Sequence, residues 1–178
     1  MSLQQFRWKL FLILGGGFGV FTGALTAFQD DVAAGIGRGI IGGLFFGVIM
    51  TLFLSRRQAS AIKKAGWTDD KVFNVVQDGA VDLPMPPDEA FGQVEHAVLQ
   101  LPSRIVTANP EAGEITARVP MSWNSWGEVL QVRIESTPAG SIARISSRPR
   151  MRLTVADFGK NRTNVERIAA ALLSGSPA

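Results

Sequence analysis

The sequence contains no cysteine and a single histidine, His96. The absence of cysteine excludes disulfide bonds, thiolate nucleophiles and cysteine-ligated zinc or iron–sulfur centres. His96 falls opposite the apolar positions of the helix predicted around it, and a solvated histidine cannot be assigned as the base for any serine. We therefore predict no catalytic residues, no metal site and no cofactor, and we expect that the protein is not an enzyme.

Charged residues are scarce near the N-terminus. Residues 10–55 carry only three of them, which are Asp30, Asp31 and Arg38. The uncharged run at residues 10–28 is close to the length of about 20 residues that crosses a hydrocarbon core, and residues 32–54 form a second apolar stretch. A cleaved signal peptide is the alternative for the first run, but that run is too long and a second one follows at once. We predict a transmembrane hairpin over residues 1–55.

Basic residues flank both predicted spans. Arg7 and Lys9 precede the first span, whereas the connection between the spans holds Arg38 beside two acids. Residues 56–66 are predicted to extend the second helix and hold four more basic residues, which are Arg56, Arg57, Lys63 and Lys64. The positive-inside rule then places both termini in the cytoplasm, with the hairpin in a bacterial inner membrane. The four basic residues either bind anionic lipid headgroups or only mark the end of the span.

The pI of about 9.8 does not indicate nucleic-acid binding. Residues 1–65 hold seven basic and two acidic side chains, a net charge of +5, whereas residues 66–178 hold 11 basic and 13 acidic ones, a net charge of −2. The positive charge therefore belongs to the flanks of the spans, where it faces membrane lipids. We expect membrane lipids and other membrane-protein subunits as partners, and no nucleic acid.

Glycine recurs at every fourth position in both predicted spans. The candidate helix-packing residues are Gly15, Gly19 and Gly23 in the first span and Gly35, Gly39, Gly43 and Gly47 in the second. Inside lipid, rows of small residues let two helix backbones approach closely, and dispersion contacts then hold them together. Whether the two rows meet each other or a partner's helices stays open. Arg38 is expected to snorkel or to pair with Asp30 or Asp31.

Residues 67–174 are predicted to form a cytoplasmic α+β domain, followed by a flexible tail at residues 175–178. Hydrophobic periodicity and turn signals give the order β-α-β-β-β-β-α, an antiparallel sheet with two helices on one face. The strands are expected at residues 72–76 with 80–83, then at 104–108, 114–119, 129–136 and 141–147. The helices are expected at about residues 88–101 and from Thr163, which has capping-box spacing to Glu166.

Two features of this domain indicate a docking surface. Trp123 and Trp126 lie in a connection between strands, and tryptophan is enriched where a protein meets a partner or a membrane. Arg148, Arg150 and Arg152 share strand parity, so one sheet face would present three guanidinium groups to an acidic protein or to lipid headgroups. The alternatives are tryptophan rings folded over the sheet core and arginines that are merely solvated.

A short motif closes the domain. It consists of Ser146-Ser147-Arg148, then Asp157-Phe158-Gly159-Lys160-Asn161-Arg162, and then an amphipathic helix. Within residues 81–173 this pattern resembles a conserved bacterial and plastid domain family of unknown function. The resemblance implies no known activity. It implies a helix-entry turn at Asp157, Gly159 and Asn161, with the Asp157 carboxylate available to Arg148 or Arg150.

A second, fainter pattern precedes the first helix of the domain. Val81-x-Leu83-Pro84-x-Pro86 leads into a helix that contains Phe91, then into antiparallel strands and a long last helix, which is similar to helix-grip lipid-binding domains. We expect a non-enzymatic accessory or scaffold subunit of a larger inner-membrane complex, docking through its glycine-faced spans and its polarised domain. The alternative, implied by the helix-grip similarity, is a membrane-tethered domain that binds a lipid or another apolar ligand.

Overall fold

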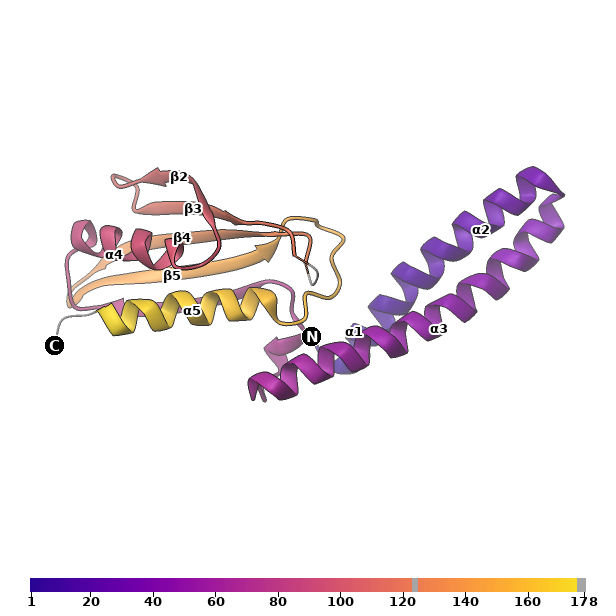
Figure 1. The fold of residues 1–178 in the computed structure, drawn as a ribbon, viewed down its shortest axis with the longest axis horizontal. Helices are drawn as coiled ribbons and strands as arrows, with labels where there is room; N and C mark the ends of the chain where they lie inside the picture. Colours follow the sequence, from indigo (N-terminus) through magenta and orange to yellow (C-terminus); the bar gives the residue numbers. More distant parts are fainter. Residues whose placement is uncertain (123–124, 176–178) are drawn as a thin grey trace. The chain divides into compact units, whose positions relative to one another are not determined.

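The computed structural model describes residues 1–122 and 125–175. The chain divides into two compact units, Met1–Phe73 and Asn74–Ala178. The first unit is helical, and the second combines an antiparallel sheet with helices (Figure 1). The predicted α+β class, with apolar helices at the N-terminus, is therefore confirmed.

Two long apolar helices make up most of the first unit. One of them runs without a break through α1 (Leu3–Leu10), the π-helical segment η1 (Phe11–Gly15) and α2 (Gly16–Gln29). The other is α3 (Val32–Ala65). With 27 and 34 residues, both are long and apolar enough to cross a membrane.

Local signals set both ends of α3. The Asp31 side chain caps the N-terminus by accepting a hydrogen bond from the Ala34 backbone N–H at 2.8 Å. Gly66 ends the helix in the left-handed conformation, with φ 71°, so the predicted extension of the helix through the basic segment is confirmed. Across the turn that precedes α3, Arg38 forms an ion pair with Asp30 at 2.6 Å, which is one of the two outcomes expected for Arg38.

The strand predicted at residues 72–76 is wrong. Asp70–Phe73 (η2) instead forms a turn of 3-10 helix. The buried side-chain amide of Gln58 donates a hydrogen bond to the Val72 carbonyl oxygen at 3.2 Å, and the neighbouring Phe73 ring packs on a phenylalanine of α1. These tertiary contacts with the helices override the β propensity of the valine-rich sequence.

The second unit is a five-stranded antiparallel sheet with the strand order β1-β5-β4-β3-β2. α4 and α5 pack on one face, and no helix among the described residues of this unit covers the other, open face (Figure 1). The predicted order β-α-β-β-β-β-α is confirmed. Its elements are β1 (Gln77–Leu83), α4 (Pro87–Leu99), β2 (Arg104–Asn109), β3 (Glu114–Val119), β4 (Glu128–Thr137), β5 (Gly140–Pro149) and α5 (Lys160–Gly175).

The core of the domain lies between the sheet and its two helices. Alternate residues of the central strands point inward and meet the apolar faces of α4 and α5 in one cluster of buried side chains. Val94, Leu130 and Ile168 in this cluster are each 0% exposed. Removal of such apolar surface from water stabilises the layered arrangement. His96 is exposed on α4, as predicted.

α5 begins at Lys160, before the predicted capping box, so that prediction is wrong. Thr163 lies inside the helix, where its hydroxyl donates a hydrogen bond to the Gly159 carbonyl oxygen at 3.0 Å. The Asp157 carboxylate takes the capping role and accepts hydrogen bonds from the backbone N–H groups of Gly159 at 3.2 Å and Asn161 at 2.9 Å. Because these N–H groups are satisfied, the helix starts one turn earlier than Thr163 suggests.

Candidate functional site

The two glycine rows face each other inside the hairpin. A methyl group added to Gly19 would lie 2.7 Å from the Gly39 carbonyl oxygen, and one added to Gly39 would lie 2.8 Å from the Gly19 carbonyl oxygen. Gly15 and Gly43 are related in the same way, at 2.8 and 2.7 Å. No side chain fits at these distances, so the two backbones touch directly, as rows of small residues allow.

The contact continues toward both ends of the hairpin. Near the turn, Gly23 lies against Gly35, and at the other end Gly47 lies against the ring of Phe11. Both rows are thus used within the chain. In this structure the glycine rows therefore pack on each other, which is one of the two arrangements that the sequence left open.

Beside the glycine contact the hairpin leaves an open apolar groove of about 650 Å³. Gly16 lines this groove, and nothing lies within 4 Å of the position that its side chain would occupy. The adjacent Gly17 is equally open but does not line the groove. Larger side chains from both helices form the walls, among them Leu12, Val20, Ile36, Ile40 and Leu44.

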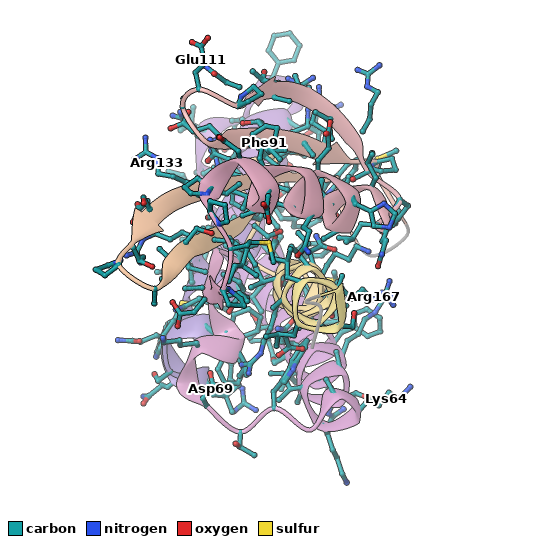
Figure 2. The ribbon with its side chains drawn as sticks, turned by 90° about the vertical axis from the view of Figure 1, so that its left-hand side faces the viewer. Lys64, Asp69, Phe91, Glu111, Arg133 and Arg167 are labelled. Atoms are coloured by element: carbon teal, nitrogen blue, oxygen red, sulfur yellow. The ribbon has the colours of Figure 1, made fainter. Side chains whose placement is uncertain are left out.

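Four basic residues lie along the last part of α3, after the predicted span. Arg56, Arg57, Lys63 and Lys64 are all exposed. Figure 2 shows the Lys64 side chain projecting away from the helix. Their contact with lipid headgroups stays a prediction.

The residues predicted for docking do not share one strand face. Trp126 is 62% exposed in the connection between β3 and β4, whereas Trp123 lies outside the described residues. β5 ends one residue after Arg148, so Arg148 is the only one of the three predicted arginines that lies on the open face of that strand. Arg150 and Arg152 follow the strand end, where side chains no longer alternate between faces, and their predicted parity with Arg148 is therefore wrong.

Strand register places other arginines in line with Arg148. Across the open face, Arg148 is paired with Val129, Val129 with Arg118, and Arg118 with Arg104. All three arginines are exposed, and no acidic side chain among the described residues forms an ion pair with any of them. Arg104, Arg118 and Arg148 are termed the arginine row.

Arginines in the middle of the same face are neutralised. Arg133 and Arg144 lie directly opposite each other in β4 and β5. Arg133 pairs with Glu114, whose hydrogen bond raises the pKa of Arg133, and Arg144 pairs with Glu135 at 2.9 Å. A hollow of about 670 Å³ lies over this part of the sheet, and Figure 2 shows Arg133 on the side away from α5.

A buried polar cluster on the inner face joins α5 to the sheet. The Ser147 hydroxyl donates a hydrogen bond to the Asn161 side-chain oxygen at 2.7 Å, and the Asn164 amide donates to the Ser147 hydroxyl at 3.3 Å. The Asn161 amide donates in turn to the Asp157 carboxylate at 2.8 Å. All four side chains are buried, so these hydrogen bonds replace the water that the polar groups have lost.

The cluster is built from the motif that closes the domain. Ser147 comes from the Ser-Arg strand, and Asp157 and Asn161 come from the Asp-x-Gly-x-Asn-Arg turn. The helix-entry turn implied by the resemblance is present, with Gly159 at φ 77°. The Asp157 carboxylate, however, bonds to this turn and to Asn161 and to neither of the two arginines proposed for it, so that pairing is wrong.

Glu128 is a buried group that the sequence reasoning missed. Its side chain is 1% exposed, one carboxylate oxygen accepts from the Ser125 hydroxyl, and the other has no hydrogen-bond partner among the described residues. Burial raises the pKa of Glu128 to about 7, against the opposing effect of the Lys160 ammonium. The alternation of β4 was the available signal, because Glu128 shares the inward parity of Leu130.

The hydrogen bonds of this cluster fasten α5 to the sheet and do not form a catalytic arrangement. The Ser147 hydroxyl is 0% exposed, and the amide oxygen that accepts its hydrogen bond cannot serve as a general base. Burial raises the pKa of Asp157, against the hydrogen bonds that it accepts from Asn161 and Gly159. Within the described residues, no cluster of three or more metal-ligating side chains is present.

The motif and its place in the fold agree with a comparison against known families. A family model described as "Protein of unknown function (DUF1499)" matches residues 61–172. The chain belongs to the DUF1499 family. The resemblance found in the sequence is confirmed. The arginine row and the buried polar cluster both lie within the DUF1499 match, whereas the glycine rows precede it.

Two further comparisons place no function on this DUF1499 protein. The search of curated proteins found no match. Among solved structures, the crystal structure of Ara h 8.0201 matches with a TM-score of 0.40 and 11% sequence identity, over 56% of this chain and 98% of that chain. At this TM-score the likeness supports no inference about the present chain.

Proposed function

We propose that this protein is a non-enzymatic accessory or scaffold subunit of a larger membrane-protein complex in a bacterial inner membrane. In this proposal the two apolar helices span the bilayer and the DUF1499 domain lies in the cytoplasm, where it docks on neighbouring subunits. The observation that carries the proposal is the apolar groove beside the glycine contact.

The groove supports docking of a transmembrane helix from another subunit. Because the glycine rows already pack on each other, the hairpin is a preformed unit with its large apolar side chains directed outward. A helix seated in the groove would approach the backbone at Gly16 and Ala24 and would contact Ile36 and Ile40 on the opposite wall. Close approach and dispersion contacts of this kind drive helix association in lipid.

The charge pattern supports the cytoplasmic side for both termini. Arg7 and Lys9 precede the first helix, and exposed basic residues follow the second span. Near the turn between α2 and α3 the only basic residue is Arg38, and it forms an ion pair with Asp30. Such a distribution favours the basic ends on the inner side of the membrane. Cysteine labelling at Ser2 and at Asp31 tests this orientation, and external labelling at Ser2 would overturn it.

The alternative function, a tethered carrier of a lipid or another apolar ligand, needs a cavity between the sheet and α5. That space holds a contiguous cluster of buried side chains, including Ile145, Ile168 and Leu172, each at most 1% exposed. Close packing there favours the accessory-subunit proposal over ligand carriage.

Mild detergent extraction from native membranes, followed by native mass measurement, tests the proposal. The wild-type protein should retain a partner. Gly16→Leu fills the groove and should release the partner, whereas Gly17→Leu, an equally open position outside the groove, should retain it. A lone monomer under all mild conditions, or equal retention by the two variants, would show that the groove is not a docking site.

A further inference from the structure

The arginine row lies at one end of the open sheet face, together with exposed apolar residues. Met121 and Trp126, in the connection that enters β4, are 67% and 62% exposed, and Leu153, in the segment that leaves β5, is 76% exposed. Both segments lie at the same end of the sheet (Figure 1). The arginine row, Met121, Trp126 and Leu153 are together termed the loop-end patch.

The fold alone does not account for the arginine row. Arg104 and Arg118 lie directly opposite each other on neighbouring strands, and like charges in that position destabilise a sheet. The comparable pair in the middle of the face, Arg133 and Arg144, is neutralised by two glutamates. A row without such compensation, at the same end of the sheet as an exposed tryptophan and an exposed leucine, points to an anionic ligand that also has an apolar part.

The chain enters the sheet at the same end. β1 begins at Gln77, which lies opposite Ser147, the residue before the row's Arg148. Only residues 74–76 separate β1 from the helical unit that ends at Phe73. The loop-end patch is therefore at the end of the sheet where the chain enters β1, whereas Glu111 marks the opposite end.

We propose that the loop-end patch binds anionic phospholipid headgroups of the membrane that holds the hairpin, with Trp126 and Leu153 inserted at the interface. This inference rests on the proposed function only in requiring that the hairpin span a bilayer. Guanidinium groups match phosphate oxygens with two hydrogen bonds each, and tryptophan favours the headgroup region. Arg150 and Arg152, beyond the strand end, add positive charge that an anionic leaflet attracts.

Spin labels on the full-length protein in nanodiscs test the inference. The chain has no cysteine, so each introduced cysteine carries the only label. Leu153→Cys reports on the patch, Ala139→Cys on the opposite end of the sheet, and Ile40→Cys on the hairpin. In nanodiscs that contain phosphatidylglycerol, the label at residue 153 should become accessible to oxygen and protected from an aqueous nickel reagent, whereas the label at residue 139 should stay aqueous.

The electrostatic part has a matched pair of variants. Arg104→Gln with Arg118→Gln removes two unpaired arginines and a like-charge contact, so the sheet should fold at least as well as before. In this variant the label at residue 153 should lose most of its membrane protection. Arg133→Gln with Arg144→Gln removes the same charge from the neutralised pair and should leave the protection unchanged.

The possible outcomes separate this inference from the proposed function. An aqueous label at residue 40 would overturn the membrane span itself. A label immersed at residue 40 and aqueous at residue 153 would overturn the lipid assignment alone, as expected if a protein partner occupies the patch instead. Equal immersion of residue 153 in pure phosphatidylcholine, or immersion unaffected by the loss of Arg104 and Arg118, would show that headgroup charge is not recognised.

Discussion

The hairpin and the DUF1499 domain reach close packing by opposite means. In the hairpin, the contact surface is backbone against backbone, because Gly19, Gly39 and Gly43 have no side chains to separate the helices. In the domain, the contact between sheet and helices is made of large side chains such as Leu130 and Ile168. In the membrane proposed for the hairpin, lipid tails would offer its helices no hydrophobic force to associate, whereas water drives the apolar side chains of the domain together. Substitutions that add atoms should therefore destabilise the hairpin, and substitutions that remove atoms should destabilise the domain.

The largest effect is expected from filling the glycine contact. In Gly39→Leu with Gly43→Leu, new side chains would meet carbonyl oxygens of the first helix at separations that no side chain tolerates. The helices should separate, at a cost of more than about 3 kcal/mol for two overpacked sites. Distance distributions between spin labels at Phe21→Cys and Ile41→Cys, both on exposed positions, should widen and shift to longer distances.

A volume-conserving change in the wall of the groove, away from the glycine contact, serves as the control. Ile40→Leu with Leu44→Ile alters exposed residues of the same helix and should leave the distance distribution unchanged. If both double variants behave alike, the close approach of the glycine rows does not hold the hairpin together.

The opposite manipulation should damage the domain. Ile168→Ala removes buried atoms from the contact between α5 and the sheet, at a cost of about 2–5 kcal/mol. Leu173→Ala, in the same helix but 65% exposed, should cost far less. Amide hydrogen exchange of β4 and β5 measures the difference in the full-length protein, and equal acceleration by the two variants would contradict the burial assigned to Ile168.

The comparison also explains which parts of the structure could be predicted from the sequence. Local sequence patterns predicted the parts of the structure that depend on the local backbone. These parts are the glycine spacing, the element order of the domain and the helix end at Gly66. The strand expected at residues 72–76 failed because Gln58, distant in sequence, holds that segment in another conformation.

Contacts between distant segments account for the remaining differences. The early start of α5 depends on the Asp157 carboxylate, which accepts hydrogen bonds from the turn that follows it. The arginine row depends on strand register, since Arg104 and Arg148 belong to strands separated by two others. No pattern in a single segment encodes that register, whereas the inward parity of Glu128 was present in the sequence and was overlooked.

A smaller effect is expected at Glu128, a buried carboxyl with one oxygen that has no hydrogen-bond partner among the described residues. Burial raises the pKa of Glu128 to about 7, above its ordinary value of 4.5. Below pH 4.5 the carboxyl is protonated in both folded and unfolded chains, so its burial costs little. Between pH 4.5 and about 7 the unfolded chain loses this proton while the folded chain keeps it, so stability falls over that range and the loss is complete above about 7.

Glu128→Gln should remove this pH dependence. The variant should be more stable than the parent by about 1–3 kcal/mol above neutral pH and similar to it below pH 4.5. Denaturant unfolding of the domain at several pH values checks the sign. A variant that is less stable at high pH would mean that the Glu128 carboxylate has a partner that compensates its charge.

The smallest effect is expected on the open face of the sheet, and its sign is more informative than its size. Arg118 faces Arg104 without an acidic partner among the described residues, so Arg118→Gln should stabilise the domain by about 0.2–1 kcal/mol at low salt, and by less at high salt. Arg133→Gln, the same substitution one strand away, leaves Glu114 without its partner and should destabilise the domain. Hydrogen exchange of β3 and β4 reports both variants. If Arg118→Gln proves destabilising, Arg118 stabilises the fold. Its unpaired charge would then give no reason to infer an anionic ligand.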